Sequence, residues 1–173
     1  MMDTRSILVA YASRYGSTQE AAETVADALR QAGLRVDLQL MQEVKSLEHY
    51  DAIVLGAAIY NARWHADAHE FLSQHEEVLR QRPVAIFSLG PTTRNPAAKK
   101  RSLSQLDRDL EKYPWLRPIA LEMFVGRYDL SKLGLGSFGR LVPLSDQRDP
   151  NAIRAWASAL PAQLEHAEML QLA

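Results

Sequence analysis

A chain of 173 residues, of which 47% are hydrophobic, is long enough for one domain with an ordinary buried core, and its composition is not that of a disordered protein. The formal charge of -1 argues against a dedicated nucleic-acid binder. The positive charge lies in the second half, because residues 1–89 carry 8 Lys/Arg against 12 Asp/Glu, whereas residues 90–173 carry 12 Lys/Arg against 9 Asp/Glu. The chain has no cysteine, which excludes disulfides, thiolate nucleophiles and iron–sulfur clusters, so redox chemistry would need an organic cofactor.

No apolar run approaches the ~20 residues of a membrane span, and residues 1–5 carry no hydrophobic stretch typical of a signal peptide. We therefore expect a cytoplasmic protein. Peripheral contact with the inner face of a membrane stays open.

The first predicted elements are a strand, a polar turn and a helix. Residues 7–11 form a continuous apolar run of strand length, as expected for a strand covered on both faces. After the turn at 13–18, apolar residues recur on one helical face, and Ser17 with Glu20 has the spacing of a capping box. Gly33 is the expected stop signal of this helix.

Strands and helices then alternate along the chain. Further strands are predicted at residues 36–40, 52–57, 84–89 and 119–125, and helices at 66–79 and 99–112. Residues 126–148 are expected to be an irregular insertion. Asp149 and Pro150 are typical of the N-cap and first turn of a last helix, which Pro161 should kink or divide.

Five short apolar strands alternating with helices predict a single α/β domain over residues 1–173, with a doubly wound parallel sheet covered by helices on both faces. In such a sheet the ligand lies beyond the carboxyl ends of the strands. The loops after the first, third and fourth strands should therefore meet at one edge. This pattern predicts a fold and names no function.

The turn between the first strand and the first helix has the composition of a phosphate site. The hydroxyls of Ser13, Ser17 and Thr18 surround Gly16 at the positive end of a helix, where backbone N–H groups point outward. The plainer alternative is an ordinary N-cap turn rich in Ser and Thr. A P-loop would need a Gly-Lys-Ser/Thr ending, and a nucleophile elbow would need glycines where this chain has tyrosines.

The segment from Ser13 to Thr18 resembles the phosphate loop of flavodoxins. The whole chain is more similar to the flavodoxin-type, menaquinone-dependent protoporphyrinogen oxidases and their uncharacterised relatives, through residues 56–65, 87–91 and 149–156 as well. This resemblance implies a flavodoxin-like fold and a non-covalently bound FMN.

The resemblance also implies which residues contact FMN. The phosphate would be held by the first loop, in which Tyr15 stands where flavodoxins usually have Thr: Ser13, Arg14, Tyr15, Gly16, Ser17 and Thr18. One side of the isoalloxazine ring would be flanked by Ala58, Ile59, Tyr60, Asn61 and Ala62, and the other by Leu89, Gly90, Pro91, Thr92, Thr93 and Arg94. Tyr60 and Trp64 offer flat apolar area to such a ring. For Trp64, packing against a helix is an equal alternative.

Three other patterns are not interpreted as sites. Residues 134–139 match the dinucleotide glycine pattern, but they do not follow the first strand, and Pro143 prevents a following helix, so a surface loop is expected. His65 and His69 have the spacing of a metal pair without a third ligand, so His65 is predicted at the pocket edge and His69 as a solvated helix residue. A phosphoreceiver domain needs an aspartate that ends the third strand, whereas Asp51 begins it.

Basic and apolar residues follow the last two predicted strands. The cations are Arg94, Lys99, Lys100, Arg101, Arg127, Lys132 and Arg140, and the apolar residues are Leu130, Leu133, Leu135, Phe138 and Leu141. A basic, apolar rim of this kind would suit an amphiphilic anion or an anionic membrane surface. The alternative is a solvated helix start and leucines that pack back onto the domain.

The resemblance implies an FMN-dependent oxidoreductase that passes electrons from a small organic donor, protoporphyrinogen IX in the family's case, to a quinone-like acceptor. One alternative is a flavodoxin-type electron carrier that docks redox proteins and turns over no substrate. Such carriers are usually strongly acidic, which a charge of -1 fits poorly. Another is a domain that has lost FMN and serves as a binding module. No catalytic side chain or metal ligand is predicted.

Overall fold

The computed structural model describes residues 4–126 and 147–172, which form a parallel sheet between two layers of helices. The strands follow the spatial order β2-β1-β3-β5-β6, and all neighbours on this path are parallel. Their bounds are β1 Ser6–Ala12, β2 Arg35–Leu40, β3 Ala52–Tyr60, β5 Val84–Leu89 and β6 Ala120–Phe124. A short strand, β4 (Arg63–Trp64), pairs antiparallel with the end of β3.

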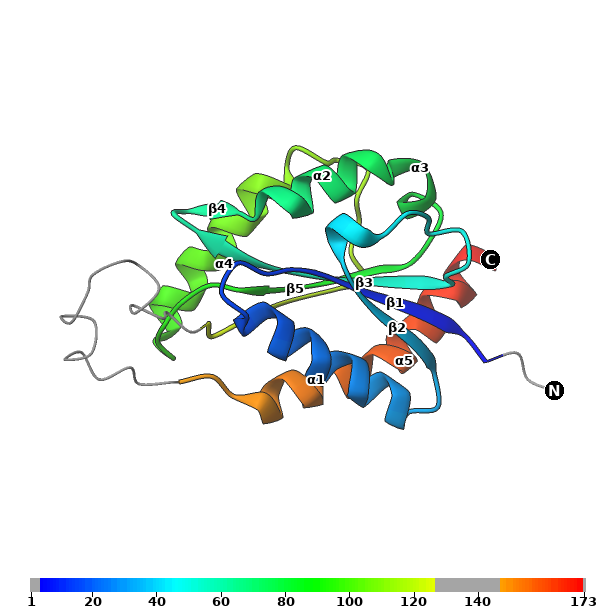
Figure 1. Ribbon diagram of the computed structural model, residues 1–173, viewed down its shortest axis with the longest axis horizontal. Helices are drawn as coiled ribbons and strands as arrows, with labels where there is room; N and C mark the ends of the chain where they lie inside the picture. The colour runs from blue at the N-terminus through cyan, green and yellow to red at the C-terminus, as the bar shows by residue number, and fades with distance from the viewer. Residues whose placement is uncertain (1–3, 127–146, 173) are drawn as a thin grey trace.

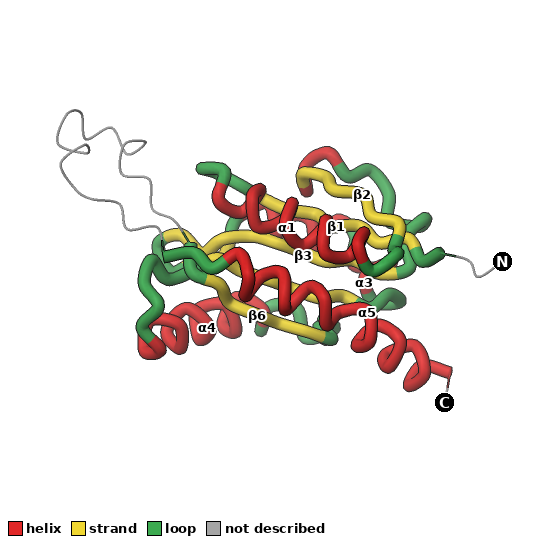
Figure 2. Tube along the Cα trace, turned by 90° about the horizontal axis from the view of Figure 1, so that it is seen from below, coloured by secondary structure: helices red, strands yellow, loops and turns green. Residues whose placement is uncertain are grey.

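Helices cover both faces of the sheet (Figures 1 and 2). One face carries α1 (Ser17–Gln31) and α5 (Pro150–Leu172). The other carries α2 (Ala66–Gln74), α3 (Glu76–Leu79) and α4 (Pro96–Leu110), with the short 3-10 helix η1 (Met41–Glu43). The predicted doubly wound sheet of five parallel strands is confirmed, and β4 adds a strand that the sequence did not predict.

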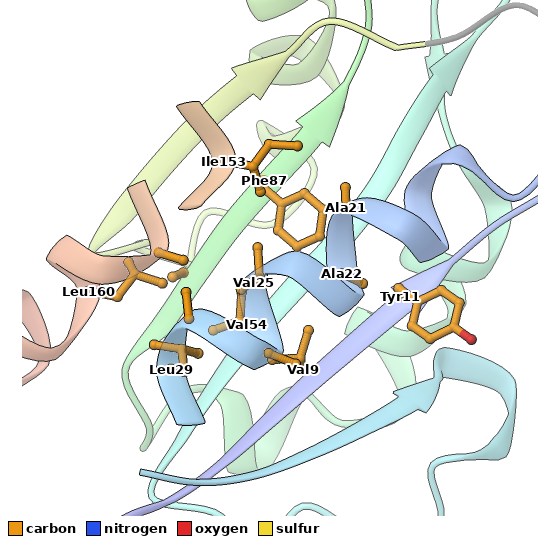
Figure 3. Packing of buried hydrophobic residues seen from close by; sticks show 14 of the residues in the cluster. Val9, Tyr11, Ala21, Ala22, Val25, Leu29, Val54, Phe87, Ile153 and Leu160 are labelled. Carbon is orange, nitrogen blue, oxygen red and sulfur yellow. The ribbon is translucent and has the colours of Figure 1, made fainter. Parts of the chain in front are cut away.

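The core under α1 shows why this sequence forms these elements (Figure 3). The residues of α1 that face the sheet recur at helical spacing, so that one stripe of the helix is apolar: Ala21, Ala22, Val25 and Leu29. They meet alternate residues of the buried strands, such as Val9, Val54 and Phe87. A Cβ on Gly56 would lie 2.0 Å from the Cζ atom of Phe87, so glycine at that position lets the phenyl ring lie across β3.

One helix prediction is wrong in its extent, since the predicted helix at 66–79 is divided at His75 into α2 and α3. Of the two outcomes predicted at Pro161, division does not occur, because α5 is a single helix with Pro161 inside it. Leu160 and Leu164 on either side of the proline are buried in the same core cluster. Its predicted cap is confirmed, since a carboxylate oxygen of Asp149 accepts from two backbone N–H groups of the first turn.

The irregular segment predicted at 126–148 lies almost wholly outside the described residues. The same holds for the glycine pattern at 134–139, and for Arg127, Lys132, Arg140 and the apolar residues between them. Within 4–126 and 147–172, no helix is both long and apolar enough to cross a membrane.

Candidate functional site

The loop between β1 and α1 has a backbone that only glycine adopts at little cost. Gly16 is the N-cap of α1 with φ of 91°, and its N–H donates to Ser13 Oγ at 2.9 Å. Ser17 is thus already the first residue of the helix, and no side chain caps it. The predicted capping box of Ser17 and Glu20 is wrong, because the turn closes one residue earlier through Ser13.

The start of α1 holds polar groups that lack partners. Thr18 has an exposed fraction of 0%, and its Oγ1 atom has no hydrogen-bond partner among residues 4–126 and 147–172. The first N–H groups of any α-helix have no acceptor within the helix, and here no side chain supplies one. Burying a hydroxyl without a partner costs free energy. A ligand that accepts hydrogen bonds and carries negative charge, such as a phosphate, would satisfy this arrangement.

The segment after β3 turns back on itself as a tight hairpin. Ile59 pairs with Trp64 and Tyr60 with Arg63, which leaves a two-residue turn at Asn61 and Ala62. Both turn residues have positive φ, 49° and 61° respectively. This is the sign that a type I′ hairpin turn requires, and asparagine tolerates it better than alanine. Sequence patterns did not reveal the hairpin, because Asn-Ala is a weaker turn signal than Asn-Gly.

A buried carboxylate on α4 supports this hairpin from behind. Asp109, whose side chain is only 8% exposed, accepts from the backbone N–H of Trp64 at 2.7 Å and pairs with Lys112 Nζ at 2.7 Å. Burial by itself would raise the pKa of Asp109, but the hydrogen bonds from Lys112 and from the Trp64 N–H lower it below its usual value. Asp109 therefore stays charged, and the position of β4 is tied to α4.

His69 belongs to the same cluster. Its Nδ1 atom lies 2.7 Å from the Tyr113 hydroxyl, and its Nε2 atom lies 3.7 Å from Asp109. Burial lowers the pKa of His69 more than Asp109 raises it, so the ring is neutral at pH 7 and the contact is not an ion pair. The prediction of a solvated His69 is wrong, because its side chain is only 24% exposed and contacts Asp109 of α4 and Tyr113. His65, in contrast, lies at the edge of a groove, as predicted.

Of the two roles predicted for Trp64, the structure shows packing within the protein and not an exposed face for a ligand. It is 3% exposed, its indole N–H reaches Ala57 O at 3.4 Å, and its ring meets His69 edge-on at 5.8 Å. The aromatic ring that the hairpin presents towards the first loop is Tyr60, which contacts Tyr15 edge-on at 5.8 Å. The guanidinium of Arg14 lies over the Tyr15 ring, 5.4 Å from the ring centre.

The segment after β5 is fixed against the end of β6. Gly90 N–H donates to Phe124 O at 3.1 Å, and a Cβ on Gly90 would lie 2.7 Å from Met123 Sδ, so this close approach requires glycine. Pro91 O accepts from the N–H of Gly126 at 2.8 Å. Arg94 donates from its backbone N–H and from Nε to Gln147, both at 3.0 Å. Thr92 is exposed, as are Thr93 and Arg94.

The structure brings parts of all three predicted segments to the carboxyl edge of the sheet. Ser13, Arg14, Tyr60 and Asn61 line one open groove of about 880 Å³. Ser17 and Leu89 line a smaller cavity of about 170 Å³ beside it. Ala58 and Ile59 lie within β3, where Ala58 is buried and Ile59 is half-buried. The first loop is thus the meeting point, with the hairpin on one side and the end of β5 on the other.

Two curated relatives are similar to part of this chain. The "Protoporphyrinogen IX dehydrogenase [quinone]" of Escherichia coli (strain K12) is 30% identical over 91 residues, which are 51% of this chain and 50% of that protein. The "NAD(P)H dehydrogenase (quinone)" of Methylocella silvestris is 31% identical over 90 residues, covering 39% of this chain and 45% of that protein. The chain therefore spans about half the length of the curated relatives it matches.

Solved flavodoxins share the fold over almost their whole length. A flavodoxin of Streptococcus pneumonia TIGR4 superposes with a TM-score of 0.58 at 18% identity, covering 91% of this chain and 99% of the other. Oxidised Flavodoxin 2 from Bacillus cereus gives 0.57 at 20% identity, covering 94% and 99%. The family model described as a flavodoxin domain matches residues 8–137. On this match, the chain belongs to the flavodoxin domain family.

Proposed function

We propose that this protein binds FMN and works as an oxidoreductase that passes electrons from a small organic donor to a quinone-like acceptor. The observation that carries the proposal is the start of α1, where the buried Thr18 hydroxyl lacks a partner beside an uncapped helix end. The two quinone-acting relatives support the acceptor, and one of them supports protoporphyrinogen IX as a donor to test first.

In this proposal each segment has a separate task. Thr18 Oγ1 and the first N–H groups of α1 donate to the phosphate, and the left-handed backbone of Gly16 keeps the loop close to it. The Tyr60 ring flanks the isoalloxazine on the hairpin side, and residues 89–94 line the other side. A bound FMN would supply a two-electron, two-proton couple, which converts a quinone to a hydroquinone.

Titration with FMN tests the binding half of the proposal. A drug-sized ligand gains roughly 0.3 kcal/mol per non-hydrogen atom, so FMN with about 31 such atoms should bind with a dissociation constant on the order of 0.1 μM. Flavin fluorescence should be quenched on binding to the flavin-free protein. Riboflavin should bind more weakly, because it lacks the phosphate that makes charge-assisted hydrogen bonds. Absence of quenching up to about 100 μM FMN would refute the proposal.

A second candidate is an electron carrier that docks protein partners. It is favoured by the solved flavodoxins, which cover more than nine-tenths of this chain. Stopped-flow reoxidation of the chemically reduced holoprotein separates the two functions. An enzyme should reduce menadione with saturation kinetics and faster than free reduced FMN does. A carrier should show a rate that rises linearly with quinone concentration and does not exceed that of the free cofactor.

A further inference from the structure

A second cavity lies on the other side of the segment that follows β5. It has a volume of about 420 Å³, which is within the range of roughly 300–1,000 Å³ typical of small-molecule sites. Its walls come from the start of α4, the end of the edge strand β6 and the first turns of α5. The helices α4 and α5 cover opposite faces of the sheet (Figures 1 and 2). The cavity is lined from both helices and from β6, so it lies at the β6 edge of the sheet. Of the residues that the structure describes, none lines both this cavity and the groove beside Ser13 and Tyr60.

The floor of this cavity is apolar and held in place. The Trp156 indole meets Phe87 and Phe124 edge-on, each with ring centres 5.9 Å apart. Phe124 and Met123, which also line the cavity, are 8% and 2% exposed. Contacts of this kind hold the half-buried indole in place, and Trp156 lines the cavity. The floor therefore offers aromatic and apolar side chains to a ligand.

Among residues 4–126 and 147–172, the charged groups that line this cavity include one cation that no carboxylate pairs with. Lys99 Nζ pairs with Glu122 at 2.7 Å. The carboxylate of Asp149 accepts from two N–H groups at the positive end of α5. Arg94 donates to a backbone carbonyl, and in the described part of the chain no carboxylate pairs with it. Its guanidinium is thus the group at this cavity that an added anion would neutralise.

From this geometry we infer a second binding site, which takes a planar aromatic anion such as a fused-ring carboxylate or a hydroxyquinone. The rings lie on Trp156 and the charged oxygens meet Arg94. Pro91, Thr93 and Arg94 line the cavity and also belong to the segment proposed to flank the flavin, so the occupant and the flavin would share that segment. The existence of this site does not depend on the proposed function. Only the statement that its occupant reacts with the flavin rests on it.

Calorimetric titration with a redox-inactive pair of probes tests the site itself. The probes are naphthoate and its neutral analogue naphthamide, added to the flavin-free and to the FMN-loaded protein. Naphthoate should bind both forms with similar affinity and more tightly than naphthamide. Arg94→Gln should weaken naphthoate about tenfold and leave naphthamide unchanged, since a hydrogen bond to a charged group contributes about that much. Arg154→Gln, at an exposed arginine of α5 outside the cavity, should change neither.

Trp156→Leu should weaken both probes, and Trp115→Leu, outside the cavity, should weaken neither. Equal binding of the two probes, or unchanged naphthoate binding in Arg94→Gln, would overturn the inference. Loss of naphthoate binding on loading FMN would also overturn it, because the cavity would then be part of the flavin site. FMN affinity measured on the same samples reports separately on the proposed function. A protein that binds FMN but not naphthoate contradicts this inference alone, and the reverse result contradicts the proposed function alone.

Discussion

Thr18, near the start of α1, is the residue whose side chain differs most clearly from what a helix start without a ligand requires. Its hydroxyl is buried and has no hydrogen-bond partner in the described part of the chain, although buried polar groups in folded proteins nearly always have one. Burying a hydroxyl without a partner costs free energy, and in the proposed FMN complex a bond to the phosphate would remove that cost. The same atom should therefore influence stability and ligand affinity in opposite directions.

Thr18→Val, which replaces the hydroxyl with a methyl group, tests this reasoning. FMN affinity should fall by about 1–3 kcal/mol, or roughly ten- to a hundredfold, if the lost bond is to a charged phosphate. The flavin-free protein should keep its free energy of unfolding or gain stability, because an unpaired buried polar atom has been removed. Fluorescence titration and urea unfolding measure the two effects. Ser104→Ala, in α4 outside the three cavities, removes a hydroxyl that already donates to Lys100 O and should leave FMN affinity unchanged.

His69 should make stability depend on pH near neutrality. Its pKa is lowered in the folded protein by burial, so below about pH 6.5 the unfolded chain takes up a proton that the folded protein resists. Stability is thus fully present above that value and declines as pH falls towards the lowered pKa. His69→Gln should lose less unfolding free energy than the wild type between about pH 7.5 and pH 5.5 in urea titrations. An identical loss in both proteins would contradict this assignment, and His166→Gln, at an exposed histidine of α5, is the control.

At the scale of elements, the hairpin of β3 and β4 is the part of the site under backbone strain. Ala62 has φ of 61°, a conformation that costs a residue with a Cβ roughly 1 kcal/mol or more and costs glycine little. Ala62→Gly should therefore stabilise the protein by about 1 kcal/mol, measured by urea unfolding. Ala155→Gly, at an exposed position inside α5, should have the opposite sign and cost about 0.5–1 kcal/mol. Destabilisation by Ala62→Gly would mean that the methyl group contributes packing that outweighs the strain.

The contact between α4 and the hairpin is the second feature at this scale. Asp109→Ala should cost about 1–3 kcal/mol of unfolding free energy, because the Trp64 N–H and Lys112 both lose their buried acceptor. Asp109→Asn keeps an oxygen that can accept from Trp64 and should cost less. Hydrogen exchange at the Trp64 amide should quicken in the alanine variant first. Asp107→Ala, at an exposed residue of the same helix, should change neither quantity.

These two features also show what the sequence could not predict. The strands and the first loop were predictable because their signals are local: continuous apolar runs mark buried strands, and hydroxyls around Gly16 mark the start of a helix. The hairpin turn has only Asn61 as a local signal. The burial of His69 depends on Asp109 and Tyr113, which lie about forty residues away and reach it only through the packing of α2 beside α4. Periodicity within one segment carries no information about such a contact.

At the scale of the whole molecule, the order of the strands makes the site possible. Since β1 lies between β2 and β3, the connection after β1 runs towards β2 and the connection after β3 runs the opposite way, towards β5, so the loops after β1 and β3 separate at that point. The groove beside Ser13 and Tyr60 lies there. The central strands are buried along almost their whole length, and they fix the positions of the loops after β1, β3 and β5. A ligand that contacts all three loops therefore binds only when the sheet is intact.

Global unfolding should accordingly be linked to FMN. At a free FMN concentration about 100 times the dissociation constant, binding to the folded state alone adds about 2.7 kcal/mol, which should raise the Tm of a domain of this size by about 5–10 °C. Riboflavin at the same concentration should raise it less, because it leaves Thr18 and the helix start without their anion. Differential scanning calorimetry over a series of FMN concentrations should give a shift that grows with the logarithm of concentration. Equal shifts for the two flavins would place the phosphate away from the start of α1, and the assignment of residues 13–18 would then be wrong.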